Sequence, residues 1–262
     1  MERSDFDSPD VNSPNAARMY DYFLGGAANF AVDRIAAEQA LAVTPEIGRF
    51  ARANRSFLGR LVAHLCDLGI DQFLDLGSGV PTVGNVHQIA HRHDPHARVA
   101  YVDVEPVAVS HARSLLDGQP HVTITQADIR SPEAVLSAPG VAGLMDFTRP
   151  VAVLAVAILH FVPDDDDPAS LVASYHRACA PGSYLGMSHA SPVTMTAEQV
   201  AGGREVYRST TTPITPRSRE AIMAMLTGWQ LLDPGLVPLD QWRPDTTGEP
   251  VANGYGALAY LP

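Results

Sequence analysis

Residues 73–81, with the sequence FLDLGSGVP, form a short apolar run that closes with an acid and two glycines one residue apart. Such a run predicts a buried parallel strand that leads into a tight turn, where bare backbone can approach a ligand. Residues 99–103, VAYVD, repeat the pattern of an apolar strand closed by a carboxylate. In a β-α-β unit this spacing presents an acid to ribose hydroxyls. The two segments therefore predict an α/β fold with a nucleoside site.

The first turn distinguishes between two kinds of nucleoside ligand. A dinucleotide-binding turn places a small residue where this chain has Thr82, and it does not need Asp75 two residues before its first glycine. A carboxylate in that place repels a pyrophosphate and pairs with an ammonium. S-adenosylmethionine combines adenosine, an ammonium and a sulfonium, so it is the ligand that this set of residues favours.

Two further strands follow along the chain. Residues 121–129, HVTITQADI, predict a third strand, with Asp128 placed to accept a hydrogen bond from an adenine amino group. Residues 150–161, PVAVLAVAILHF, predict a fourth strand that is apolar enough to be buried on both faces. Ligands of open parallel sheets lie at the carboxyl ends of the strands. Residues 157–160 are therefore expected at the same edge as the three acids.

With these four strands the chain resembles the class I methyltransferases that use S-adenosylmethionine, over roughly residues 45–262. The resemblance implies a Rossmann-like α/β fold, with a seven-stranded, mostly parallel sheet and helices on both faces. Pro81 departs from the family's first motif, which has a small residue in this part of the turn. The cofactor-binding residues that the strand ends and the resemblance indicate are Asp75, Gly77, Ser78, Gly79, Asp103, Val104, Asp128, Ile129 and Ala157.

A narrower resemblance begins nearer the N-terminus. Residues 15–26, NAARMYDYFLGG, and residues 53–58, ANRSFL, look like a largely actinobacterial group, the S-adenosyl methyltransferase family, once catalogued as a domain of unknown function. This resemblance covers almost the whole chain. It implies the same cofactor and assigns no physiological substrate.

Composition and punctuation predict how the chain is organised. Apolar residues make up 46% of 262 residues, enough for one large α/β core. Helical spacing before the sheet is broken at Gly25-Gly26 and again at Thr44-Pro45, where Thr44 is expected to cap the next helix. The predicted segments are a disordered tail (1–13), a helical N-terminal extension (14–67) and a methyltransferase domain (68–262) with a helical insert (192–227), closed by a hairpin-like pair (228–232 with 256–261).

Aromatic residues next to Gly25-Gly26 suggest that the extension is a lid. Tyr20, Tyr22 and Phe23 stand beside these two glycines, which would be costly inside a plain packing helix. A lid over a cofactor needs a joint of this kind. The alternative is that the aromatic residues are the apolar face of a short helix.

Candidate catalytic residues are those expected beside the methyl acceptor. They are Tyr20, Tyr22 and His160, with His189 as a weaker fourth; a general base is needed only when the acceptor must lose a proton. Gly25, Gly26, Tyr22 and Arg55 are added to the cofactor set, Arg55 as a partner for the cofactor carboxylate. A solvated helix face is the alternative for Arg55, and a satisfied wall residue is the alternative for His160.

The net charge of −11 disfavours a nucleic-acid substrate, because phosphate binding depends on lysine and arginine. A small or cationic acceptor is favoured instead. Residues 150–161 lack the Asn/Asp-Pro-Pro-aromatic signature with which DNA amino-methyltransferases hold a flipped base. The chain begins without an apolar signal, its two cysteines lack a paired framework, and no apolar run approaches the ~20 residues of a membrane span. A cytoplasmic protein without membrane contact is therefore expected.

Three other interpretations are weaker. A metal site at His87, His91, His93 and His96 is not expected, because no acid or cysteine completes a ligand set. A nicotinamide-dependent oxidoreductase is opposed by Asp75 and by Thr82 in the third small-residue position. A regulatory protein that binds S-adenosylmethionine without transferring its methyl group stays open as an alternative.

Overall fold

The computed structural model describes residues 11–81, 84–244 and 253–262. Within them eight strands form one sheet. The strands are β1 (Gln72–Leu76), β2 (Arg98–Asp103), β3 (Val122–Gln126), β4 (Ala152–Val156), β5 (Tyr184–Ala190), β6 (Gln230–Leu231), β7 (Val237–Pro238) and β8 (Gly254–Tyr260). The helices are α1 (Ala16–Phe23), α2 (Ala31–Val43), α3 (Ile47–Asp67), α4 (Val86–His93), α5 (Pro106–Leu115), α6 (Pro132–Ser137), α7 (Pro139–Ala142), η1 (Leu159–Phe161), η2 (Asp164–Asp166), α8 (Pro168–Ala178), α9 (Ala197–Arg208) and α10 (Arg219–Met225).

The sheet has the order β3-β2-β1-β4-β5-β8-β6. Strands β1 to β5 pair in parallel, whereas β8 runs antiparallel to β5, β6 and β7. The predicted Rossmann-like sheet is therefore confirmed, and β7 adds a two-residue strand beside β8. The strand order reverses between β1 and β4, and this switch point is where open α/β sheets bind ligands.

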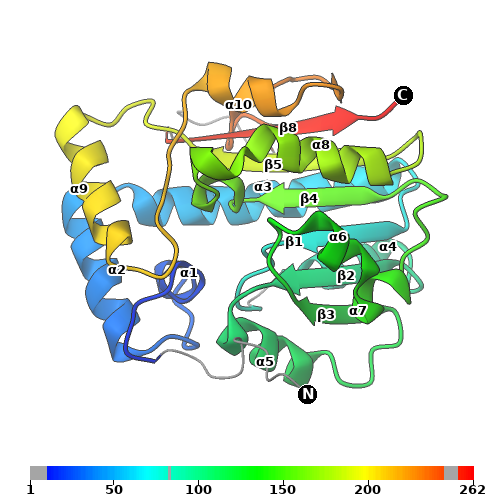
Figure 1. Cartoon of the computed structure of the whole chain (residues 1–262), viewed down its shortest axis with the longest axis horizontal. Helices are drawn as coiled ribbons and strands as arrows, with labels where there is room; N and C mark the ends of the chain where they lie inside the picture. The colour runs from blue at the N-terminus through cyan, green and yellow to red at the C-terminus, as the bar shows by residue number, and fades with distance from the viewer. Residues whose placement is uncertain (1–10, 82–83, 245–252) are drawn as a thin grey trace.

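Helices cover both faces of the sheet because its central strands are apolar on both sides. Phe73 packs into the core beneath α3, α4 and α5, whereas its neighbour Leu74 packs into the opposite core beneath α6, α8 and α10. Both side chains are fully buried. Figure 1 shows α3 and α4 behind the sheet and α8 in front of it. None of the helices in the described ranges is both long and apolar enough to cross a bilayer.

A third core joins the N-terminal extension to the insert. Met19, Ala37 and Tyr207 bring α1, α2 and α9 together in it, and Gly202 of α9 lies against Val43 of α2 with no room for a Cβ between them. We call α1, α2 and α9 the helical cap. In Figure 1 the cap stands at the left, beyond the carboxyl ends of the parallel strands.

Two predicted boundaries are wrong. The fourth strand ends at Val156 rather than near residue 161, because Ala157 takes a positive φ of 54° and the chain turns into η1. His160 therefore lies on η1. Thr44 does not cap α3: it ends α2, and α3 begins at Ile47 behind Glu46. The Thr44 hydroxyl is left buried and without a hydrogen-bond partner among the described residues.

Gly25 and Gly26 close a local turn around Asp21. Gly25 has a positive φ of 78°, and a Cβ on Gly26 would overlap the Asp21 carboxylate. That carboxylate is buried and accepts hydrogen bonds from the Ala28 backbone N–H (2.9 Å) and the Asn29 side-chain amide (2.8 Å). The turn around Asp21 thus explains why glycines occupy these two positions, without a flexible joint for a lid. Of the predicted tail, residues 1–10 lie outside the described residues.

Candidate active site

A cavity lies between the carboxyl ends of the parallel strands and the helical cap. One side is formed by the turns after β1, β2 and β4, and the other by α1, α3, η1 and α9. Its lining includes these predicted cofactor residues: Asp75, Gly77, Ser78, Gly79, Asp103, Val104, Ala157 and Arg55. Tyr20 and His160, predicted beside the acceptor, line it as well.

The turn after β1 depends on its glycines. Gly77 and Gly79 have positive φ values of 71° and 65°, and a Cβ on Gly77 would overlap Ile158. The N–H groups of Gly77 and Ser78 donate to the Val102 carbonyl at 2.8 and 3.1 Å, which fastens the turn to β2. At Gly79 a Cβ would meet nothing within 4 Å. The turn therefore offers bare backbone and open space to a ligand.

Asp103 holds the turns after β1 and β2 together. Its carboxylate accepts from the Gly79 N–H at 2.6 Å and from the Glu105 N–H at 2.9 Å. Burial raises the pKa of Asp103 to about 6, against the lowering effect of those two hydrogen bonds and the one at Val104. Each carboxylate oxygen can accept a further hydrogen bond, so Asp103 can take ribose hydroxyls without giving up the turn.

Asp75 is the second buried carboxyl of the cavity, at the end of β1. Burial raises the pKa of Asp75 to about 7; Arg55 acts to lower it and Asp103 to raise it. The Arg55 guanidinium donates to the Asn85 side chain at 3.0 Å. A bound ammonium would favour the ionised carboxylate and drive a proton off Asp75.

This linkage predicts that cofactor affinity depends on pH. Below the raised pKa the Asp75 carboxyl is protonated and cannot pair with an ammonium. Affinity for S-adenosylhomocysteine is therefore expected to rise from about pH 6 to about pH 8, with a limiting slope of about tenfold per pH unit below the pKa. Calorimetry across this range checks the slope. Asp75→Asn should make this affinity nearly independent of pH. The affinity for adenosine, which lacks the ammonium, should depend less on pH in the unmodified protein. The same slope in Asp75→Asn would contradict the pairing of Asp75 with the ammonium.

The residues around the turn fit S-adenosylmethionine. The Ser78 hydroxyl is buried in the cavity lining, and none of the described residues gives it a hydrogen-bond partner. A buried orphan hydroxyl is costly unless a ligand satisfies it. The same lining includes two carboxyls, Asp75 and Asp103, suited to an ammonium and to ribose hydroxyls. The donor set therefore matches the polar groups of this cofactor.

The two candidate histidines are neutral, and neither has the geometry of a general base. Burial, together with His189 and Arg217, places the pKa of His160 well below its usual range. Its Nδ1 accepts the Ala190 N–H at 3.2 Å, so Nε2 carries the proton. Burial also lowers the pKa of His189 to about 4, and its Nε2 lies 3.2 Å from the Arg217 guanidinium. His189 packs behind His160 and is not itself among the residues that line the cavity.

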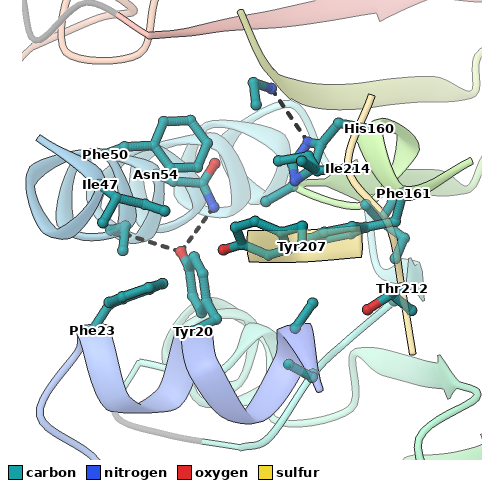
Figure 2. Close-up of a pocket in the computed structure, with 18 of the residues that line it drawn as sticks. Tyr20, Phe23, Ile47, Phe50, Asn54, His160, Phe161, Tyr207, Thr212 and Ile214 are labelled. Carbon is teal, nitrogen blue, oxygen red and sulfur yellow. Dashed lines mark hydrogen bonds between the residues drawn. The ribbon is translucent and has the colours of Figure 1, made fainter. Parts of the chain in front are cut away.

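Tyr20 belongs to a hydrogen-bond chain that crosses the cavity wall. Its hydroxyl donates to the Ala51 carbonyl at 3.0 Å and accepts from the Asn54 amide at 3.0 Å. Asn54 accepts from the Ser188 hydroxyl at 2.5 Å, and Ser188 accepts from the Ala157 N–H at 2.9 Å. The phenol proton is thus already committed to Ala51. Tyr20 joins α1 to α3 through Asn54 (Figure 2), and Ser188 continues this chain to the ends of β5 and β4.

Several predicted site residues lie outside the lining of this cavity. Tyr22 is turned away and donates its hydroxyl to Glu38 on α2. Asp128 is held by the Arg130 guanidinium at 2.6–3.0 Å, and Ile129 is buried in the core. Gly25 and Gly26 line a second pocket. Arg55 lines both pockets, and the adenine contact of Asp128 stays a prediction.

Most of the cavity wall on the side of the cap has no signal in the sequence. We call this wall the acceptor half; it is formed by Thr44 and by apolar and hydroxyl side chains of α1, α3, η1, α9 and the segment 210–216. Figure 2 shows Phe23, Phe50, Phe161, Tyr207 and Ile214 arranged around it. The Thr/Pro-rich break at 210–216 is visible in the sequence, but only the packing of α9 on α2 brings it to the site.

The histidine cluster of α4 has other partners. His87 contacts the Tyr101 hydroxyl at 2.8 Å, and His91 contacts the Ala97 carbonyl at 3.0 Å. Within the described ranges no group of three or more His, Cys, Asp or Glu side chains could hold a metal ion.

The fold and the turn chemistry are those of a methyltransferase that uses S-adenosylmethionine. Similarity to the N-methyltransferase NodS from Bradyrhizobium japonicum WM9, solved with S-adenosylhomocysteine, supports this fold: the TM-score is 0.53 at 15% identity, over 94% of this chain and 99% of that one. The model of the S-adenosyl methyltransferase family matches residues 3–261, and the chain belongs to this family. The predicted family, enzyme class and cofactor are therefore confirmed.

Two solved structures are similar over nearly the whole length. One is a DUF574 family protein from Streptomyces avermitilis MA-4680, with a TM-score of 0.91 and 34% identity over 97% of this chain and 99% of that one. The other is a proposed methyltransferase from Thermobifida fusca YX, with a TM-score of 0.91 and 36% identity over 98% and 99%. No significant match was found among curated proteins.

Proposed function

We propose that this protein transfers the methyl group of S-adenosylmethionine to a small molecule bound in the acceptor half of the cavity. The observation that carries the proposal is the continuity of the cavity, whose lining runs from Asp75 and Asp103 to the apolar wall under the cap. A cap that encloses this wall suits a small acceptor better than a polymer. The net charge of −11 supports an acceptor other than nucleic acid.

The side chains of this site bind and orient. When bound, the cofactor supplies a methyl carbon on a sulfonium; the acceptor lone pair forms the new bond, and the carbon–sulfur electron pair stays on the sulfur. In this proposal Asp103 binds the ribose hydroxyls and Ser78 binds another polar group of the cofactor. Asp75 pairs with the ammonium. The buried aromatic wall excludes water, and holding the reacting atoms in line accounts for much of the acceleration.

The lining side chains that are not assigned to the cofactor provide no general base. His160 is neutral with its lone pair occupied, Glu105 is ion-paired to Arg18, and Glu46 to Arg49. This favours an acceptor whose attacking atom has a free lone pair at neutral pH.

The cysteines Cys66 and Cys179 are unpaired, which supports a reducing, cytoplasmic compartment.

The test is a search for a methylated product. The protein is incubated with S-adenosylmethionine and a metabolite extract, and mass spectrometry follows species that gain one methyl group as S-adenosylhomocysteine accumulates. We expect at least one such product, absent with Asp103→Ala. Tight cofactor binding without consumption in any extract would instead favour the regulatory, non-catalytic alternative.

A further inference from the structure

Three hydroxyl groups in the acceptor half have no hydrogen-bond partner among the described residues. Those of Thr44 and Thr212 are buried. The Tyr207 hydroxyl also receives no hydrogen bond from the described part of the chain, but its oxygen is not among the buried unpartnered atoms. All three residues line the same cavity. Buried hydroxyls are normally paired, since leaving one unpaired costs free energy, so Thr44 and Thr212 beside one cavity indicate that a ligand completes them, and Tyr207 offers the same ligand a third hydroxyl.

The surroundings of these hydroxyls are aromatic and apolar. The rings of Phe23, Phe50, Phe161 and Tyr207 come from α1, α3, η1 and α9, and Figure 2 shows them surrounding one space. The Phe161 and Tyr207 rings lie 6.0 Å apart between centroids and are tilted by 38°. Rings in this arrangement favour a flat apolar ligand, which they contact by stacking and edge-on packing.

Charge decides between the ligands that an aromatic wall can hold. Such a wall also attracts cations, but a cationic acceptor would lie beside the sulfonium in a site of low dielectric, where like charges repel strongly. An anionic acceptor would lose its hydration on binding. In the described part of the acceptor half no buried cation compensates for that loss, because Arg204 is exposed. A neutral ligand avoids both penalties.

We propose that the acceptor is an uncharged molecule with a flat apolar ring, and that its oxygen or nitrogen atoms are bound by Thr44, Thr212 and Tyr207. These three residues then determine specificity. The proposal rests on the proposed function, because it assigns the substrate class of the same cavity. It requires the buried hydroxyls of Thr44 and Thr212 to destabilise the free protein, and all three hydroxyls to stabilise the complex.

The first measurement is the melting temperature of the free protein. Thr212→Val and Tyr207→Phe remove the hydroxyl and keep the side-chain shape. Thr212→Val is expected to raise Tm by about 1–4 °C, because an unsatisfied buried group is lost. Tyr207→Phe should leave Tm nearly unchanged, because the Tyr207 oxygen is not among the buried unpartnered atoms. Tyr184→Phe is the matched control: its ring packs against Tyr260 outside the cavity lining, and Tm should not change. A lower Tm in Thr212→Val would show that its hydroxyl serves the fold and would overturn the proposal.

The second measurement compares probes on the protein saturated with S-adenosylhomocysteine. The probes are 2-naphthol, naphthalene, 2-naphthoate and the trimethylanilinium cation, and dissociation constants come from ligand-observed NMR. We expect 2-naphthol to bind most tightly, and each variant to weaken it by about 2–10-fold without changing naphthalene.

Each other outcome is informative. Tightest binding by the cation or by naphthoate, equal loss for naphthol and naphthalene, or no binding by any probe overturns the neutral-ring proposal. Affinity for S-adenosylhomocysteine, measured in the same samples, should be unchanged in both variants. Failure of the unmodified protein to bind it would contradict the proposed function itself and not the substrate class alone.

Discussion

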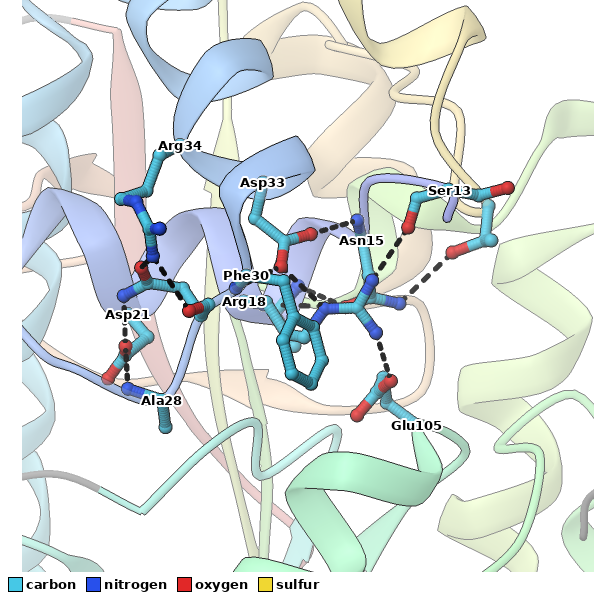
Figure 3. A network of polar contacts seen from close by, with 12 residues as sticks. Ser13, Asn15, Arg18, Asp21, Ala28, Phe30, Asp33, Arg34 and Glu105 are labelled. Carbon is cyan, nitrogen blue, oxygen red and sulfur yellow. Dashed lines mark hydrogen bonds and ion pairs between the residues drawn. The ribbon is translucent and has the colours of Figure 1, made fainter. Parts of the chain in front are cut away.

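Replacing Arg18 by methionine is expected to lower the free energy of unfolding by about 3–5 kcal/mol, because it leaves buried charges without a partner. Arg18 is 1% exposed on α1. Its guanidinium forms ion pairs with Asp33 at 2.8 Å and Glu105 at 2.7 Å, and donates to the Ser13 carbonyl at 2.7 Å (Figure 3). Methionine fills a similar volume but leaves the buried carboxylates of Asp33 and Glu105 without their ion-pair partner.

Chemical denaturation measures this effect, and Arg34→Met is the matched control. Arg34 lies on the exposed side of α2 and donates only to Asn29 among the bonds seen for it, so its loss should change the free energy of unfolding by about 0.5 kcal/mol or less. Hydrogen exchange should show residues 14–34 losing protection first in Arg18→Met. A loss below about 1 kcal/mol would mean that Asp33 and Glu105 do not depend on Arg18 for compensation.

Asp103→Ala is expected to weaken binding of S-adenosylhomocysteine about tenfold to a hundredfold. Hydrogen bonds to a charged group contribute about 1.5–3 kcal/mol, and the ribose hydroxyls would lose this acceptor. The variant also frees the Gly79 and Glu105 N–H groups, so Tm must be measured beside the calorimetric affinity.

Asp128→Ala is the informative comparison, because its carboxylate is held by Arg130 outside the cavity lining. A much smaller loss is expected there. Equal losses in the two variants would establish the adenine contact predicted for Asp128. Unchanged affinity in Asp103→Ala would refute the ribose assignment.

The cofactor side of the cavity was predictable because its signals are local. The acid, two glycines and apolar run at residues 73–81 fix the strand and turn by backbone requirements alone, and the spacing to Asp103 follows from one β-α-β unit. The acceptor half has no such signal. Tyr207 and Thr212 reach it only through the packing of α9 on α2, which joins segments more than 150 residues apart in the chain.

Two expectations differ from the structure for separate local reasons. The apolar run predicts a strand that includes His160, but the strand ends before Ala157, whose positive φ is not encoded by a glycine. Sequence proximity groups Tyr22 with Tyr20, yet residues two apart on a helix face different directions. Tyr22 thus meets Glu38, while Tyr20 meets Asn54.

The ion pair between Arg18 and Glu105 has a consequence for how molecules enter. Glu105 caps α5 through the Ala108 N–H and lies two residues after Asp103, so α1 is fastened to the same turn that is expected to bind ribose. Moving α1 outward would separate a buried arginine from two acids. Tyr207 is the only buried residue of helix α9. The acceptor is therefore expected to enter the cavity beneath α9. The cofactor side of the cavity would then stay closed while one acceptor molecule is exchanged for the next.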